Sequence, residues 1–377
     1  MLKKILIAPN AFKYSLNAIE VAKFIKSALN SLNLNLECEL SPIADGGDGT
    51  IDILNFNYPN SKFIKTKVHD PLMREIKSSW LLWDENTAVI ELAKASGITL
   101  LSEKELNPFW ANTYGTGELV LSALDKGCKK IIVALGGSAT IDGGVGILEA
   151  LGIRFEDKKK NKVNSGGGFL SSIEKINSNH LDRRIRDCEL SLLCDVNIPL
   201  TGENGTVHKF ASQKGAKEGE KVILEKGMKH LSKIAKQYTR NNFELEPMTG
   251  SAGGVAFSLK TFLGAKLSPG FLYLANLISL EEKIKNSDLI ITGEGNLDSQ
   301  SLMGKGVIEL AKLAKKHNKK VIVLCGDYDE NINWREHYVE HVIKIKPENL
   351  SSEESIRNTK ELIVKAIEQN IELFIKF

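Results

Sequence analysis

The feature of this chain that most constrains its fold is a recurring order of short apolar run, polar or glycine-rich loop, and helical segment. The order appears near the start at 4–32, in the middle at 130–151 and near the end at 288–314. Continuous apolar runs of about five residues are typical of strands that are buried on both faces. Strands that alternate with helices form α/β layers with mainly parallel sheets. The chain is therefore predicted to be an α/β protein.

The first helix carries both a start signal and an apolar face. Asn17 and Glu20 have the spacing of a capping box, in which each side chain binds the other residue's backbone N–H. Apolar residues then recur at intervals of three and four, which places them on one side of a helix. These residues are Ala18, Ala22, Ile25, Leu29 and Leu32.

The last part of the chain predicts three strands, at 288–292, 321–325 and 341–346, and a loop over 293–298. Ser352 is predicted to cap a closing helix on which Ile356, Ile363 and Ile367 share one face.

The middle of the chain predicts strands at 130–135 and 190–194 and a short helix at 144–151. A glycine loop at 250–254 leads into an apolar helix that ends near Gly264. The lysine-rich segment 158–162 is predicted to be a solvated hairpin tip.

The two ends of the chain resemble each other, because both contain short buried strands followed by polar loops. The runs between 62 and 91 lack helical periodicity and predict antiparallel additions to the sheet. We predict a Rossmann-like parallel-sheet domain built from residues 1–90 and 285–377, with a second, different α/β domain inserted at 91–284. Ligands of such sheets bind at the C-terminal ends of the strands, so the predicted active site is the cleft between the domains.

Charge and composition exclude several kinds of partner. The 50 basic and 47 acidic residues leave a net charge of only +3, too little for a strong field toward nucleic acid or an anionic membrane. No stretch approaches the roughly 18 apolar residues of a membrane span. The five cysteines contain no CxxC pair, which is typical of reduced thiols in a reducing compartment. We expect a cytoplasmic monomer or homodimer that binds small molecules.

Three glycine loops are candidate phosphate cradles, because glycine lets successive backbone N–H groups approach an anion. They lie at 136–140, 250–254 and 293–295. The chain has no GxxxxGK[ST] motif, and no GxGxxG follows the first strand, so a P-loop or dinucleotide site is not predicted. Each loop can equally be a tight turn without a ligand. The candidate residues are Gly136, Gly137, Ser138, Thr140, Gly253, Gly254 and Gly293.

Carboxylates stand in two of the polar loops. Asp45 and Asp48 flank Gly46 and Gly47, and Glu294 and Asp298 lie in the last glycine loop. Such carboxylates suit Mg²⁺, which takes one or two of them together with phosphate oxygens and water, and they suit a general base. The alternative is that each caps a turn or a helix.

Three further charged residues are candidates. Asp195 ends an apolar run, where a charge needs a partner or a function. Lys13 follows the first strand and Lys305 starts a helix, so either can bind a substrate carboxylate or a phosphate. The alternative for each lysine is an ordinary surface position.

These segments together resemble the bacterial glycerate kinases that phosphorylate D-glycerate without a P-loop. The likeness runs from about Ile5 to about Gly326. It is carried by APNAFK at 8–13, ADGGDGT at 44–50, NTYGTGE at 112–118, GGSATIDGG at 136–144, CDVN at 194–197, QKGA at 213–216, TGEG at 292–295 and Gly304-Lys305. The resemblance implies a two-domain α/β fold, ATP with Mg²⁺, D-glycerate as substrate and 2-phosphoglycerate as product, with 3-phosphoglycerate as the alternative product.

The chain departs from the family pattern at three places. Asn10-Ala11 replaces the usual Asp-Ser, and Asn296 replaces the usual Arg. Thr249 and Ser251 differ from the usual small residues of their loop. The first two departures keep a second interpretation open, a non-catalytic glycerate or nucleotide sensor. A nucleotide-dependent oxidoreductase is a third, which the missing GxGxxG opposes.

The mechanistic hypothesis is direct in-line transfer of a phosphoryl group. Lys13 and Lys305 hold anionic groups, Asp45 and Asp298 hold Mg²⁺ or orient the hydroxyl, and Asp195 is the base. The catalytic candidates are thus Asp195, Asp298, Lys13 and Lys305, and the metal candidates are Asp45 and Asp298. The candidates for binding substrate or phosphate are Asp45, Gly46, Gly47, Gly136, Gly137, Ser138, Thr140, Gly253, Gly254, Gly293 and Glu294.

Overall fold

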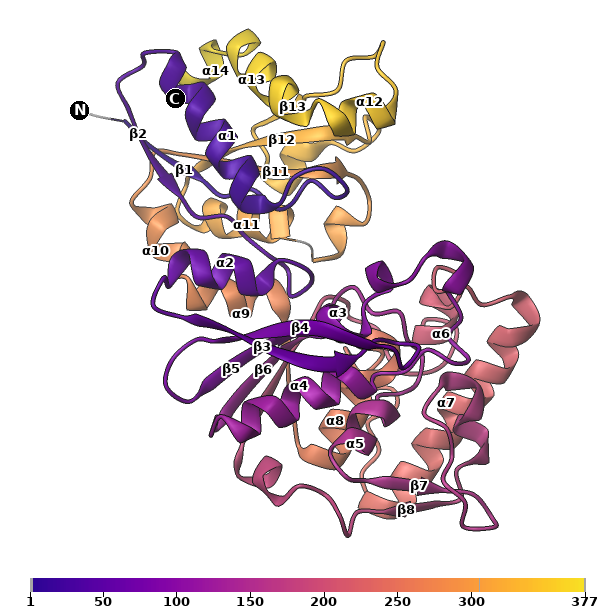
Figure 1. Ribbon diagram of the computed structural model, residues 1–377. Coiled ribbons are helices and arrows are strands. Elements are labelled where there is room, and N and C mark those ends of the chain that lie inside the picture. Colours follow the sequence, from indigo (N-terminus) through magenta and orange to yellow (C-terminus); the bar gives the residue numbers. More distant parts are fainter. Residues whose placement is uncertain (1–2, 305, 376–377) are drawn as a thin grey trace. The chain divides into compact units, whose positions relative to one another are not determined.

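The structure is a computed structural model that describes residues 3–304 and 306–375 (Figure 1). The chain divides into two compact units. Unit 1 contains Met1–Asp45, Asp52–Asn57 and Phe271–Phe377, and unit 2 contains Gly46–Ile51 and Tyr58–Gly270.

Unit 1 is built on a five-stranded sheet in which every pair of neighbours is parallel. Its strands are β1 (Lys3–Ile7), β2 (Leu36–Leu40), β11 (Leu289–Leu297), β12 (Lys320–Tyr328) and β13 (His341–Lys344). The spatial order is β13-β12-β11-β1-β2. This is a doubly wound order, whose direction reverses between β1 and β11. Sheets of this kind bind ligands outside the strand C-termini at that reversal.

Helices cover both faces of the unit 1 sheet (Figure 1). Two of them, α1 (Ala18–Ser31) and α13 (Thr359–Gln369), pack beside each other over a core that includes Ile5 and Ile291. On the opposite face lies α11 (Gly306–Lys316), as a right-handed crossover from β11 to β12 requires, and α10 (Leu280–Lys285) packs beside it. The remaining helices that include residues of this unit are α2 (Thr50–Asn57), α9 (Gly270–Leu277), η5 (Ser301–Met303), η6 (Trp334–His337), α12 (Ser352–Arg357) and α14 (Glu372–Ile375).

The helix caps follow the local sequence closely. Asn17 and Glu20 form the predicted capping box at the start of α1. At α12 the cap is Ser351 rather than Ser352, because the Ser351 hydroxyl accepts the Glu354 N–H while the Glu354 carboxylate accepts the Ser351 N–H. Ile356 lies on α12 and is partly exposed, whereas Ile363 and Ile367 are buried on α13.

The predicted loop over 293–298 is wrong for most of its length. Strand β11 continues to Leu297, since its backbone pairs with β12 as far as Tyr328. A Cβ added to Gly293 would lie 2.3 Å from the carbonyl oxygen of Leu324. Gly293 therefore allows two neighbouring strands to approach closely, a role that needs no ligand.

Unit 2 is built on a six-stranded mixed sheet in the order β10-β9-β6-β5-β4-β3. The first four strands in this order are parallel, and β4 is antiparallel to both β5 and β3. The strands are β3 (Lys62–His69), β4 (Glu75–Leu82), β5 (Thr87–Glu91), β6 (Lys130–Ala134), β9 (Glu189–Cys194) and β10 (Lys266–Pro269). A separate hairpin joins β7 (Arg154–Glu156) to β8 (Lys175–Asn177). The prediction of two different α/β domains is thus confirmed.

The boundaries of the units differ from those expected. The antiparallel additions between 62 and 91 are present, but they extend the sheet of unit 2 rather than that of unit 1. Strand β5 pairs in parallel with β6, with Ile90 opposite Val133. Since β4 pairs with β5 and β3 pairs with β4, all three strands belong to the sheet of unit 2. Unit 1 resumes at Phe271 rather than at 285.

The helices of unit 2 include α3 (Ala93–Ser96), α4 (Tyr114–Asp125), α5 (Val145–Ala150), α6 (Thr206–Phe210), α7 (Glu218–Thr239) and α8 (Ser251–Leu263). Short 3₁₀ helices are η1 (Ile98–Leu100), η2 (Glu103–Glu105), η3 (Gly167–Ser172) and η4 (Arg183–Asp187). One continuous apolar core contains the fully buried side chains of Trp80, Phe155 and Phe257. Segment 158–162 forms an exposed tip beside β7, as predicted.

All five cysteines are free thiols. Within residues 3–304 and 306–375, no helix has the length and the apolar character that crossing a bilayer requires.

Candidate active site

Three neighbouring parallel strands of unit 2 end at one edge of the sheet. Strand β5 ends at Glu91, which is opposite Ala134 of β6, and Ala134 is in turn opposite Leu193 of β9. The residues that follow these strands include Gly136 and Asp195. Sequence positions about 100 residues apart are thus brought to the same edge, where α/β sheets place their ligands.

The 44–50 segment approaches this edge through glycine backbone. The Gly136 N–H donates to the carbonyl oxygen of Gly46 at 3.1 Å. A Cβ on Gly136 would lie 2.6 Å from the Cα of Gly47, so a side chain there would push the two loops apart. Gly46 itself has a φ of +91°, which L side chains rarely adopt. The structure therefore brings together Gly46, Gly47 and Gly136, three of the predicted residues.

The 136–140 loop turns back on itself through its polar side chains. The Ser138 hydroxyl lies 3.1 Å from the Thr140 hydroxyl and accepts the Thr140 N–H at 3.1 Å. Gly137 has a φ of +80°, and a Cβ built on it would lie 3.3 Å from a carboxylate oxygen of Asp48. The loop is therefore both compact and close to the acidic 44–50 segment.

A lysine absent from the predicted set binds this loop from inside the unit. The Lys214 ammonium donates to the Thr140 carbonyl oxygen at 2.8 Å and to the Ser138 hydroxyl at 3.2 Å. Lys214 is only 6% exposed. Burial lowers its pKa to about 8, while the negative charges of Asp195 and Asp142 act in the opposite direction.

Asp142 organises the far end of the same glycine-rich segment. Its fully buried carboxylate accepts the backbone N–H groups of Thr113, Gly144 and Gly146 and the Thr113 hydroxyl. Burial raises the pKa of Asp142 against the effect of these hydrogen bonds. Asp142 thus joins the start of α4 to the start of α5, which is a scaffolding role.

The glycines at the start of α8 fill a packing role. A Cβ on Gly253 would lie 2.0 Å from the Thr140 carbonyl oxygen, and the Gly253 carbonyl oxygen accepts the Gly143 N–H at 2.9 Å. Ala252, Gly253 and Gly254 all have positive φ, so the backbone is kinked here before the regular helix begins. Gly253 and Gly254 therefore lie against the 136–144 segment, as a tight turn would.

Asp195 follows the last residue of β9, at the predicted position, and its side chain is exposed. Its charge acts on Lys214 and on the neighbouring Cys194 thiol. An exposed carboxylate at the C-terminal end of a strand, next to a buried cation, can accept a proton from a bound hydroxyl.

In unit 1 the predicted residues gather where the sheet order reverses, between β1 and β11. The Asn10 N–H donates to the Gly293 carbonyl oxygen at 2.8 Å, and the Asn10 side chain accepts the Ala11 N–H at 2.8 Å. Glu294 lies one residue further along β11 and is 7% exposed. The Lys13 side chain is exposed, and its backbone nitrogen would lie 3.3 Å from a Cβ on Gly295.

Asp298 holds a turn. One carboxylate oxygen accepts the Gln300 N–H at 2.8 Å and the other accepts the Asn296 side-chain amide at 2.7 Å. Asn296, the departure from the family pattern, therefore contacts a predicted metal ligand. The alternative that this carboxylate caps a turn is realised, and each oxygen keeps capacity for a further contact.

The candidate ligands of Mg²⁺ are individual carboxylates rather than a cluster of side chains. Within residues 3–304 and 306–375, no group of three or more histidine, cysteine, aspartate or glutamate side chains could hold a metal ion. That excludes a cage made of such side chains in this part of the chain, but it suits an ion held by one or two carboxylates and phosphate oxygens. Asp45, which is half-buried, and Asp298 both belong to unit 1. Lys305 lies outside the described residues.

The predicted residues that the structure describes are divided between the two units. Unit 2 holds Gly46, Gly47, Gly136, Gly137, Ser138, Thr140, Asp195, Gly253 and Gly254, and unit 1 holds Lys13, Asp45, Gly293, Glu294 and Asp298.

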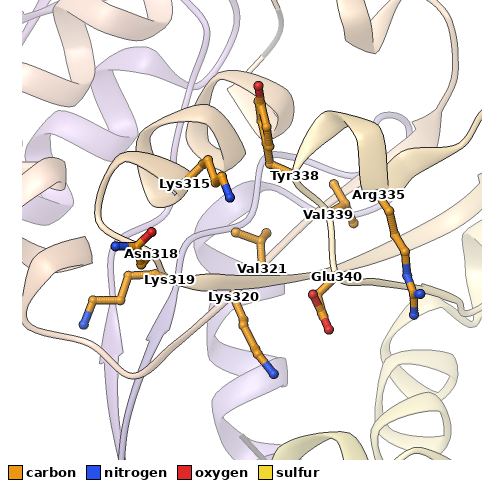
Figure 2. A pocket seen from close by; sticks show the side chains of 9 residues that line it. All are labelled: Lys315, Asn318, Lys319, Lys320, Val321, Arg335, Tyr338, Val339 and Glu340. Atoms are coloured by element: carbon orange, nitrogen blue, oxygen red, sulfur yellow. The ribbon is translucent and has the colours of Figure 1, made fainter.

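Elsewhere in unit 1 there is a hollow of about 320 Å³ that none of these residues line (Figure 2). It is lined by residues from the end of α11, the start of β12 and the segment around η6, among them Lys320 and Tyr338. Since β12 begins at Lys320, this hollow lies at the N-terminal edge of the sheet, opposite the strand ends that carry Asn10 and Asp298. It plays no part in the candidate site.

Comparison with known proteins identifies the family. The model of the glycerate kinase family matches residues 5–375. The chain belongs to the glycerate kinase family. Glycerate 2-kinase of Escherichia coli strain K12 is 36% identical over 365 residues, which is 96% of each chain. Glycerate kinase of Bacillus subtilis strain 168 is 36% identical and covers 95% of this chain and 94% of its own.

A crystal structure of a protein from Salmonella typhimurium LT2, described as a candidate glycerate kinase 2, has the same fold. It matches with a TM-score of 0.84 and 32% identity, over 100% of this chain and 99% of its own. The resemblance seen in the motifs is confirmed. As a member of the glycerate kinase family, the chain is an enzyme, a phosphotransferase with an alcohol group as acceptor.

Sequence reasoning missed two residues of the glycerate kinase fold that shape the candidate site. Lys214 lies in the QKGA motif, which contributed to the family resemblance but received no role of its own. Glu91 ends β5 and is 1% exposed, whereas in the sequence it is only the polar residue at the end of an apolar run. The motif was the available signal for Lys214, and no local pattern shows that its side chain is buried.

Proposed function

We propose that this chain phosphorylates a hydroxyl of D-glycerate with Mg·ATP to give 2-phosphoglycerate, with 3-phosphoglycerate as the alternative product. The observation that carries the proposal is the cluster at the C-terminal edge of the unit 2 sheet. There the 136–140 loop, the buried Lys214 ammonium and the exposed Asp195 carboxylate belong to one electrostatic and hydrogen-bonded group. Relatives that cover nearly the whole chain are named as a glycerate 2-kinase and a glycerate kinase.

Phosphoryl transfer asks a protein mainly to position the reactants and to balance charge. In the proposed reaction a hydroxyl oxygen of glycerate bonds to the γ-phosphorus of ATP, the bond from that phosphorus to ADP breaks with its electrons on ADP, and the hydroxyl proton passes to Asp195. Asp195 suits this role because its carboxylate is exposed at a strand end. Backbone N–H groups of the 136–140 loop are the proposed phosphate donors.

The unit 1 residues are proposed to bind the anionic and metal-bound parts of the reactants. Lys13 offers an exposed ammonium beside the point where the sheet order reverses, which suits a phosphate or a carboxylate. Asp45 and Asp298 are the proposed carboxylate ligands of Mg²⁺, which when bound would screen the charge of the phosphates. Lys305 keeps its proposed role as a second anion-binding lysine.

The test is ³¹P NMR of the full-length protein incubated with D-glycerate, ATP and MgCl₂. We expect ADP and a new phosphomonoester signal, whose coupling to one or two protons distinguishes the 2-phosphate from the 3-phosphate. A sample with L-glycerate controls for the substrate and one with EDTA for the metal. If ATP and D-glycerate remain unchanged while calorimetry shows that both bind, the chain is a sensor rather than a kinase.

A further inference from the structure

Lys214 is a buried cation that the proposed reaction does not yet use. Two of its three N–H donors are directed at the Thr140 carbonyl oxygen and the Ser138 hydroxyl, both in the loop that follows β6. With 6% of its surface exposed, the side chain is deep inside unit 2, although it comes from the segment just after α6.

Holding a loop with a buried, protonated lysine costs free energy. Burial disfavours the ammonium, which is why the pKa of Lys214 falls to about 8. A neutral donor could bind a hydroxyl and a carbonyl oxygen without this cost. A buried lysine with a lowered pKa beside charged partners at a strand edge is a common sign of a functional site.

The charges that face Lys214 explain what the ammonium can do there. Asp195, at the end of β9, and Asp142, in the 136–144 segment, are the charged groups whose fields act on it. Asp142 is already bound by four donors and belongs to the scaffold. Asp195 is exposed, so it is the carboxylate of the two that can meet a substrate.

We infer that Lys214 is a positioning residue for phosphoryl transfer, which fixes the Ser138–Thr140 turn and places a positive charge near Asp195, the proposed acceptor of the hydroxyl proton. The inference rests on the proposed function and assigns Lys214 no contact with substrate. The ammonium must be protonated to act, so turnover should fall as the pH rises through about 8.

The experiment compares Lys214→Met and Lys214→Arg with the wild type over pH 5.5–10 in a coupled ADP assay. We expect Lys214→Met to lower kcat by about a hundredfold, with KM for D-glycerate and ATP changed less than about threefold, because the loss falls on chemistry. Lys214→Arg keeps the charge, so it should recover much of kcat and lose the fall near pH 8.

Lys283 offers a matched control in unit 1. Its half-buried ammonium donates to the Ser41 hydroxyl at 3.1 Å and the Asn57 side-chain oxygen at 3.0 Å, and burial lowers its pKa as well. Lys283→Met should therefore keep the wild-type kcat and pH profile. Circular dichroism melts show whether each variant folds. If Lys214→Met does not fold, the pH profile of Lys214→Arg tests the inference.

The outcomes separate the two proposals. If the wild type phosphorylates D-glycerate but Lys214→Met retains kcat within about threefold, the positioning role is overturned and the proposed function stands. If kcat of Lys214→Arg still falls near pH 8 as in the wild type, the positioning role is overturned in the same way. If the wild type forms no phosphoglycerate, the proposed function fails and this inference fails with it.

Discussion

The carboxylate of Glu91 accepts a hydrogen bond from the backbone N–H of Ile51 at 2.9 Å. Glu91 is the last residue of β5, and Ile51 lies in the first turn of α2, directly after the 44–50 segment. A buried acid at a strand end therefore satisfies one of the free N–H groups at a helix start and fixes the segment that carries Gly46 and Gly47.

This contact predicts that Glu91→Ala is destabilising. The Ile51 N–H would lose its acceptor inside the protein, which costs about 1–3 kcal/mol of unfolding free energy. Glu91→Gln keeps an oxygen acceptor and should recover much of that loss. Urea denaturation of the three proteins measures the difference, and equal midpoints for Glu91→Ala and wild type would show that the bond contributes nothing.

The close approach of Gly253 to Thr140 predicts a severe effect of a single methyl group. In Gly253→Ala the new Cβ would lie 2.0 Å from the Thr140 carbonyl oxygen, at a φ of +67°. We expect a loss of at least about 3 kcal/mol or failure to fold. Gly264 has nearly the same φ, +69°, but nothing lies within 4 Å of its Cβ position.

Gly264→Ala is therefore the matched control, because it tests the positive φ without the steric clash. It should cost only about 1–2 kcal/mol. Thermal melts of both variants provide the comparison. If the two alanines destabilise equally, the contact with Thr140 is not what requires glycine at position 253.

The proposed roles of two aspartates predict losses of turnover without losses of stability. Asp195→Asn and Asp298→Asn should each lower kcat at least about a hundredfold. The asparagine oxygen at position 298 can still accept the Gln300 N–H, so the turn should survive. Wild-type turnover of either variant in a coupled ADP assay would remove that residue from its proposed role.

Asp157 provides the control for a turn-holding carboxylate outside the candidate site. It accepts the backbone N–H groups of Lys159 and Asn161 at the exposed hairpin tip. Asp157→Asn should leave kcat unchanged. A comparable loss of kcat in this variant would attribute the effect of Asp298→Asn to loss of a turn rather than to loss of a charge at the site.

The lowered pKa of Lys214 predicts a specific dependence of stability on pH. The folded-state pKa of about 8 is below the ordinary value of 10.5, so the unfolded state binds more protons between these values. Stability from this group therefore rises as the pH increases from about 8 to 10.5, by at most about 3 kcal/mol.

Lys214→Met has no proton to lose and should lack this rise. The measurement is the difference in unfolding free energy between wild type and Lys214→Met at pH 7 and at pH 10. A difference that is the same at both pH values would mean that Lys214 does not titrate in this range in the folded protein.

The sequence was sufficient to predict features that depend on nearby residues. The apolar runs of β1, β6 and β9 and the capping box of Asn17 and Glu20 are all where local patterns place them. The motifs predicted the family, because long ordered matches carry more information than any single spacing. Asp195 was predicted at a strand end because a charge after an apolar run is rare.

Other features depend on contacts between distant segments. The strands between 62 and 91 could extend either sheet, and the pairing of β5 with β6 decided for unit 2. Residues 293–297 read as a loop because of their glycines, yet pairing with β12 makes them a strand.

The sequence by itself determined the α/β alternation, the capping box of α1 and the membership of the glycerate kinase family, since each depends on residues close together or on ordered motifs. Only the tertiary structure decided which sheet received β3–β5, and that Lys214 is buried against Thr140 beside Asp195. The physical reason is that strand pairing and burial are set by the packing of segments far apart in the chain, whereas a local pattern reports only on its neighbours.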